Sequence, residues 1–116
     1  MPPAEGAVTI LVVDDDDRVR SAVSRFLDQR GYEALAAGTA EEALDVLGRR
    51  RVTAVLLDVR LPGVSGVDLV PRVLAAEPDA ALLMLTAVND ATSAALCMQR
   101  GAMDYLIKPV DLAQLD

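Results

Sequence analysis

The sequence predicts an α/β fold in which a doubly wound, five-stranded parallel sheet carries helices on both faces. Short apolar runs alternate along the chain with segments whose apolar residues recur at helical spacing. A strict alternation of strands and helices is typical of parallel sheets with right-handed crossovers. The chain has 116 residues, of which 53% are hydrophobic, and this fits one domain, residues 1–116, with a sizeable core.

The first half of the chain predicts two strands and two helices. The β-branched run at residues 8–13 is typical of a strand covered on both faces. The next helix ends at Gly31 and has apolar residues at helical spacing: Val19, Ala22, Val23, Phe26 and Leu27. A more mixed strand is expected at residues 32–37, and Thr39 with Glu42 forms a capping box after it. That second helix is expected to bury Ala40, Ala43, Leu44 and Leu47.

The middle of the chain predicts a third strand at residues 54–57 and a turn containing Pro and Gly at residues 62–63. Ser65 and Asp68 suggest a cap that opens a third helix. Its expected inner face is Leu69, Val70, Val73 and Leu74. Pro71 lies inside this helix and should kink it or shorten its first turns.

The last part predicts a buried fourth strand at residues 81–85, a small-residue helix at 91–100 ended by Gly101, and a short fifth strand at 105–107. The first, third and fourth strands are the most apolar and suit the centre of the sheet. The expected order is therefore 2-1-3-4-5, as in flavodoxin-like folds. Residues 111–116 give only about a turn and a half of a final helix, which looks truncated.

The composition excludes several classes of function. The formal net charge of −7 argues against a nucleic-acid surface, because neutralising phosphates requires clustered Lys and Arg. With no histidine and one cysteine, Cys97, the chain cannot build a Cys/His zinc site, a Ser-His-Asp triad or an internal disulfide. No apolar run approaches the roughly 18 residues of a membrane span, and residues 1–5 lack the basic start of a signal peptide. We expect a cytoplasmic domain that binds neither nucleic acid nor membrane.

Polar residues follow the carboxyl ends of the predicted central strands, where ligands gather in such sheets. The set comprises Asp14 and Asp15 after the first strand, Asp58 after the third, Thr86 after the fourth and Lys108 after the fifth. Taken singly, each has an ordinary explanation as a turn, cap or surface residue, and capping accounts for the neighbouring aspartates, Asp16 and Asp17. Three nearby carboxylates, however, repel one another unless a divalent cation neutralises them. Of the 11 cationic residues only Lys108 is a lysine, which suggests a point charge facing an anion.

Three segments carry a resemblance to a known family, and their residues match it in order and spacing. They are residues 10–15 (ILVVDD), 56–63 (LLDVRLPG) and 101–109 (GAMDYLIKP). In these segments the chain resembles the receiver domain of two-component response regulators, and the match runs from Ile10 to Leu115. The resemblance implies that a sensor histidine kinase or a phosphotransfer protein is the partner, and that an output domain or target protein receives the signal.

The resemblance assigns the phosphoryl and metal chemistry. Asp58 is similar to the family's phosphoacceptor, which takes a phosphoryl group from a phosphohistidine. Asp15, Asp58 and the backbone carbonyl of Arg60 would hold Mg²⁺ or Mn²⁺, with Asp14 acting largely through water. Arg60 and Val88 resemble the positions that govern water access to the acyl phosphate, which suggests slow hydrolysis. The domain would then not be an enzyme in the usual sense, because it would catalyse only its own phosphorylation and dephosphorylation.

The same resemblance implies a conformational switch. Lys108 would pair with one phosphoryl oxygen and the Thr86 hydroxyl would bond another, with a cis peptide expected at Lys108–Pro109. Tyr105 would fill the space that Thr86 vacates; its structural alternative is a packing residue of an edge strand. The switch would remodel the face made by the helix at 91–100, the strand at 105–107 and the final helix, which could also support a homodimer.

The final segment and two other functional readings complete the expectations. A chain that stops at Asp116 looks like a receiver excised from a longer protein, with apolar surface around Tyr105, Leu112 and Leu115 left to weaken the fold or to self-associate. The first alternative function is a phosphohydrolase of the haloacid-dehalogenase type, with Asp14 as nucleophile and Asp16 as acid. That reading leaves Asp58 without a role. The second alternative is a receiver-fold interaction module that is not phosphorylated.

Overall fold

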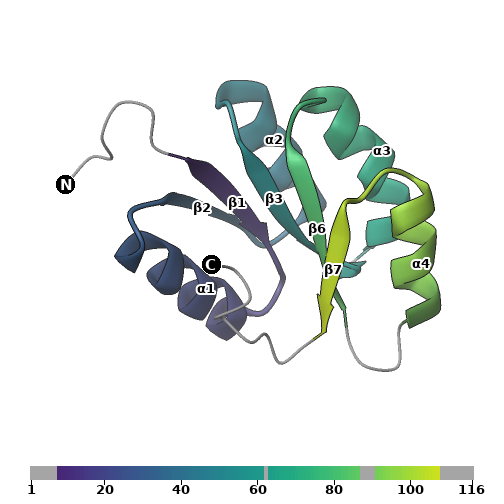
Figure 1. Cartoon of the computed structure of the whole chain (residues 1–116), viewed down its shortest axis with the longest axis horizontal. Helices are drawn as coiled ribbons and strands as arrows, with labels where there is room; N and C mark the ends of the chain where they lie inside the picture. The colour runs from purple at the N-terminus through teal and green to yellow at the C-terminus, as the bar shows by residue number, and fades with distance from the viewer. Residues whose placement is uncertain (1–7, 62, 87–90, 108–116) are drawn as a thin grey trace.

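The computed structural model describes residues 8–61, 63–86 and 91–107 of the chain (Figure 1). Its elements, in chain order, are β1 (Thr9–Val13), α1 (Asp17–Gln29), β2 (Glu33–Ala37), α2 (Ala40–Arg49), β3 (Ala54–Asp58), β4 (Arg60–Leu61), β5 (Val64–Ser65), α3 (Gly66–Ala76), β6 (Ala81–Thr86), α4 (Ala91–Gln99) and β7 (Asp104–Ile107). Within these ranges no helix is long and apolar enough to cross a lipid bilayer.

The main sheet has five strands in the order β2-β1-β3-β6-β7, and each neighbouring pair is parallel. The predicted fourth and fifth strands correspond to β6 and β7. The predicted fold class and the strand order 2-1-3-4-5 are therefore confirmed. The arrowheads of the central strands point to one edge of the sheet, where the polar residues of interest follow (Figure 1).

A small hairpin interrupts the alternation and was not predicted. The two-residue strands β4 and β5 pair antiparallel, with Arg60 opposite Ser65 and Leu61 opposite Val64. Gly63 in the connecting turn has a φ of 76°, a left-handed conformation that favours glycine. The hairpin lies directly after β3 and so helps to fix the backbone beside Asp58.

The sheet separates two apolar clusters, as the period of two along a strand requires. On one face, α1 packs Val23 and Leu27 against Val12 and Leu56. The opposite face carries residues of α2, α3 and α4, which form the larger cluster. Figure 1 shows α1 on the side of the sheet opposite to these three helices. The predicted final helix at residues 111–116 lies outside the described residues.

Helix α1 begins and ends as its sequence predicts. The Asp16 side chain caps it by accepting a hydrogen bond from the Arg18 backbone N–H at 2.9 Å. At the other end, Gly31 has a φ of 86° and closes the helix. Ala22, which shares the apolar spacing of this helix, is exposed. Each helical residue turns about 100°, so Ala22 points away from the stripe formed by Val23 and Leu27.

Helix α3 runs from Gly66 through Pro71 to Ala76, so the proline does not shorten its first turns. A proline at this position cannot donate a hydrogen bond to the carbonyl of Val67 four residues earlier. That carbonyl accepts a long contact of 3.5 Å from the Arg100 guanidinium, which also pairs with Asp68 at 3.3 Å. The Ser65 side chain caps the helix by accepting from the Val67 N–H at 3.2 Å.

The capping box of α2 supports a stability prediction. The Thr39 hydroxyl accepts from the Glu42 N–H at 3.1 Å, and the Glu42 carboxylate accepts from the Gly38 N–H at 3.0 Å. We expect Thr39→Ala to lower the free energy of unfolding by about 1 kcal/mol, because the Glu42 N–H of the first turn loses its side-chain acceptor. Urea denaturation measures the change, and Thr39→Ser should restore most of it. A Thr39→Ala protein as stable as wild type would contradict the role of this cap.

Candidate functional site

Three carboxylates meet at the carboxyl edge of the sheet. Asp14 follows the last residue of β1, Asp15 comes next in the chain, and Asp58 is the last residue of β3. One oxygen atom from each of the three carboxylates lies within 4.8 Å of the other two. β1 and β3 are direct neighbours, with Val13 opposite Leu57, and this register brings the two strand ends together. The structure thus assembles the acidic group that the sequence placed at this edge.

Two of the three carboxylates are buried and hydrogen-bonded to nearby backbone. Asp14 is 0% exposed and Asp58 is 6% exposed, whereas Asp15 is exposed. Oδ1 of Asp14 accepts from the Asp16 N–H at 2.9 Å, and Oδ1 of Asp58 accepts from the Arg60 N–H at 3.1 Å. These bonds hold the carboxylates in place, but they leave three negative charges in close proximity. Hard oxygen ligands at this spacing suit a divalent cation such as Mg²⁺.

Thr86 lies beside this group on the neighbouring strand. It ends β6, follows the residue that pairs with Asp58 in the sheet, and is 1% exposed. Tyr105 lies one strand further out, on β7, and is 39% exposed. Thr86 is therefore inside the fold, while the Tyr105 side chain is at the surface.

Of the other predicted site residues, three are not described by the structure and two have a described contact. Lys108, Pro109 and Val88 lie outside the described residues. Arg60 begins β4, two residues after Asp58. Its backbone N–H donates a hydrogen bond to the Asp58 carboxylate. Asp16 serves as the cap of α1, as expected from the sequence.

Two residues that sequence reasoning missed support the site from behind. Gly66 is buried at the start of α3, and its N–H donates to the Val59 carbonyl at 2.6 Å. Arg20 reaches back from α1 to donate to the Asp14 carbonyl at 2.6 Å. A glycine as the first helical residue and an arginine three residues after Asp17 are the only sequence signals for these contacts, and neither signal is specific.

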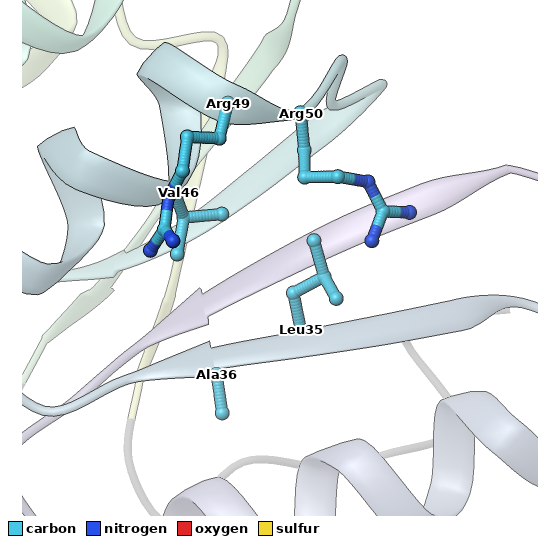
Figure 2. A pocket seen from close by; sticks show the side chains of 5 residues that line it. All are labelled: Leu35, Ala36, Val46, Arg49 and Arg50. Atoms are coloured by element: carbon cyan, nitrogen blue, oxygen red, sulfur yellow. The ribbon is translucent and has the colours of Figure 1, made fainter.

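A surface pocket lies on a different part of the molecule. Figure 2 shows Val46 and Arg49 of α2, and Arg50 directly after it, above Leu35 of the edge strand β2, with Ala36 completing the lining. Arg49 pairs with Asp45, and Arg50 pairs with Glu33. No carboxylate of the acidic group lines this pocket, so the candidate site is the carboxyl edge of the sheet.

Comparison with known proteins gives consistent matches. The sequence profile of the response regulator receiver domain matches residues 10–116. A cyclic di-GMP phosphodiesterase of Thermotoga maritima is 34% identical over 93% of this chain and 29% of its own length. The DNA-binding transcriptional regulator NtrC of Azospirillum brasilense is 34% identical over 94% of this chain and 23% of its own length. The chain therefore spans less than a third of these curated relatives.

A solved structure extends the match to three dimensions. The crystal structure of a response regulator protein from Burkholderia pseudomallei, with a phosphorylated aspartic acid, calcium ion and citrate, is 29% identical with a TM-score of 0.85. The alignment covers 93% of this chain and 64% of that chain. The resemblance noted in the sequence is thus confirmed over nearly the whole chain. This protein belongs to the response regulator receiver domain family of two-component signal transduction.

Proposed function

We propose that this chain is the phosphoacceptor domain of a two-component system, with Asp58 as the residue that is phosphorylated. The observation that carries the proposal is the place of Asp58, at the end of β3 and within 4.8 Å of two other carboxylates. A receiver-family relative that carries a phosphorylated aspartic acid supports it.

The proposed reaction is a transfer to the Asp58 carboxylate. One of its oxygens attacks the phosphorus of a phosphohistidine on a sensor kinase or phosphotransfer protein. The new O–P bond makes an acyl phosphate, the N–P bond breaks, and its electron pair returns to the imidazole. The hydrogen bond from the Arg60 N–H to Oδ1 orients the carboxylate for this attack. Lys108 and the Thr86 hydroxyl are proposed to bind the transferred group.

Mg²⁺ or Mn²⁺ is the proposed cofactor, and the residues present fit such an ion. Asp15 and Asp58, together with the backbone carbonyl of Arg60, would hold it, and Asp14 would act largely through water. Their oxygen-only donor set and the mutual repulsion of three carboxylates both favour a hard divalent cation. When bound, the ion offsets the charge that develops on the phosphoryl oxygens.

The output is proposed to be conformational. Phosphorylation would draw the buried Thr86 toward the new anion, and Tyr105 would move inward from its exposed position. The surface that would change includes apolar side chains on and near α4 and β7 that are exposed: Leu96, Met103, Tyr105 and Ile107. An apolar surface of this kind suits a homodimer or a contact with an output domain.

A larger protein is the proposed context for this chain. Its curated relatives are longer and have names as different as a phosphodiesterase and a transcriptional regulator. We propose that the receiver controls an output domain or target in the cytoplasm and catalyses only its own phosphorylation and dephosphorylation. The exposed Arg60 beside Asp58 is proposed to slow hydrolysis by restricting water.

The phosphohydrolase alternative does not fit the family match or the site. It requires Asp14 as an accessible nucleophile and Asp16 as an acid. Asp14 is 0% exposed, and the Asp16 carboxylate accepts from the Arg18 N–H as a helix cap. The alternative of an unphosphorylated interaction module is addressed by direct assay.

Incubation with acetyl phosphate and Mg²⁺, followed by intact-mass measurement, tests the proposal. We expect one added phosphoryl group, none without a divalent cation, and none with Asp58→Asn. Asp15→Asn should also abolish the addition by loss of a metal ligand. Asp79→Asn is the matched control, because Asp79 is exposed in a turn and should leave labelling unchanged. An unlabelled wild-type protein would favour the interaction module.

A further inference from the structure

Arg20 of α1 joins three segments behind the candidate metal site. One guanidinium nitrogen, Nη1, donates to the Asp14 carbonyl at 2.6 Å, and the other, Nη2, pairs with the Asp17 carboxylate. A Cβ atom on Gly38, in the loop after β2, would come within 2.8 Å of Nη1. The guanidinium is therefore packed between the end of β1, the first turn of α1 and the loop that follows β2.

The contact with Asp14 bears on a metal ligand that has little other support. The Asp15 side chain is exposed. Within the part of the chain that the structure describes, no hydrogen bond or ion pair holds its carboxylate. The Asp14 carbonyl and the Asp15 nitrogen belong to one rigid peptide plane. Fixing the carbonyl oxygen therefore fixes the direction in which the chain enters Asp15. Arg20 achieves this from outside the carboxylate group, through the backbone.

We propose that Arg20 is a positioning residue for divalent-cation binding, which it favours by holding the Asp14–Asp15 peptide so that the Asp15 carboxylate faces Asp58. The inference rests on the proposed function, since it assumes that Asp15 and Asp58 hold Mg²⁺. Residues that orient metal ligands typically change metal affinity about 10- to 100-fold when they are replaced.

The sign of the effect separates positioning from charge. Arg20 is a cation close to a cation site, so by charge alone its removal would strengthen Mg²⁺ binding. A positioning role requires the opposite, weaker binding on removal. Arg18 provides the matched control, because it lies in the same helical turn and is exposed. The hydrogen bond from Arg18 to the Asp16 carboxylate is donated by its backbone N–H, which a substitution of the side chain leaves in place. Arg18→Met removes the same charge and leaves Arg20 in place.

Titration calorimetry of the 116-residue chain with MgCl₂ alone tests the proposal. We expect Arg20→Met to raise the Mg²⁺ dissociation constant about tenfold or more. Arg18→Met should leave it unchanged or lower it slightly. Arg20→Lys, which keeps the charge and one donor, should give an intermediate value. Thermal melts without Mg²⁺ establish that each variant is folded.

A second variant moves the guanidinium without changing any charge. Gly38→Ala places a Cβ against Nη1, and the flexible end of Arg20 must give way. We expect Gly38→Ala to weaken Mg²⁺ binding in the wild-type chain and to add nothing in the Arg20→Met chain, because both changes act through the same contact.

The outcomes of these experiments separate the positioning role of Arg20 from the proposed function of the chain. If wild type binds Mg²⁺ and Arg20→Met binds it as tightly as Arg18→Met does, the role of Arg20 is overturned and the proposed function stands. Equal effects of Gly38→Ala in both backgrounds would also overturn it. A wild-type chain that does not bind Mg²⁺ would overturn the proposed function and this inference together.

Discussion

Asp58→Asn is expected to stabilise the metal-free protein while it abolishes phosphorylation. The substitution keeps the shape of the side chain and an acceptor for the Arg60 N–H, and it removes one of three negative charges that lie within 4.8 Å of one another. Relief of this repulsion should raise the free energy of unfolding by on the order of 1–3 kcal/mol at low salt. At roughly 4 °C per kcal/mol, the value at which the ranges for smaller and larger domains meet, the thermal midpoint should rise measurably.

The response to Mg²⁺ should change in the opposite sense. Wild type should melt at a higher temperature when millimolar Mg²⁺ is present, because the ion binds only the folded arrangement of carboxylates. Asp58→Asn should respond much less. Asp79→Asn removes the same charge from an exposed turn and should behave as wild type in both conditions. A metal-free Asp58→Asn protein less stable than wild type, or a wild-type melt that ignores Mg²⁺, would contradict this account of the charges.

Gly66→Ala is expected to be the most destabilising single change described here. A Cβ at this position would lie 2.6 Å from the Val59 carbonyl oxygen and 2.7 Å from that of Asp58. Both are backbone atoms, so relief requires α3 to move away from the segment that carries Asp58, the proposed phosphoacceptor. We expect a loss of roughly 2–4 kcal/mol in the free energy of unfolding. Phosphorylation by acetyl phosphate should also slow in the fraction that stays folded.

Gly48→Ala is the matched control for this effect. Gly48 lies inside α2 and an added Cβ would meet nothing within 4 Å. The same chemical change should therefore stabilise the protein there, by about 0.5–1 kcal/mol, through helix propensity. Chemical denaturation of both variants gives the comparison. Similar stabilities for Gly66→Ala and Gly48→Ala would show that α3 and the end of β3 are less tightly packed than the structure indicates.

The parts of the fold that follow from local patterns were predictable from the sequence. The most apolar strands, such as the run at residues 8–13, occupy the centre of the sheet because both of their faces are covered. The Asp16 cap and Gly31 end α1 as their residue types predict. The meeting of Asp14 with Asp58 followed from topology, because neighbouring parallel strands end at the same edge.

Other features depend on contacts to backbone atoms and carry little residue-type signal. Gly66 is required by two carbonyl groups, and any residue could supply those carbonyls. Arg20 likewise bonds the backbone of Asp14, so its spacing predicts only the ion pair with Asp17. The hairpin of β4 and β5 has two residues per strand, too few to show a period. Ala22 shares the apolar spacing of α1 and is nevertheless exposed, because an alanine fits both a buried and an exposed helix position.

The central claim is that Asp58 accepts the phosphoryl group, and locating the modified residue tests it most directly. After reaction with acetyl phosphate and Mg²⁺, borohydride reduction converts an aspartyl phosphate into homoserine, which peptide mass spectrometry can place in the sequence. The account predicts homoserine at position 58 and at no other aspartate. Homoserine at position 14 with Asp58 unchanged would contradict it.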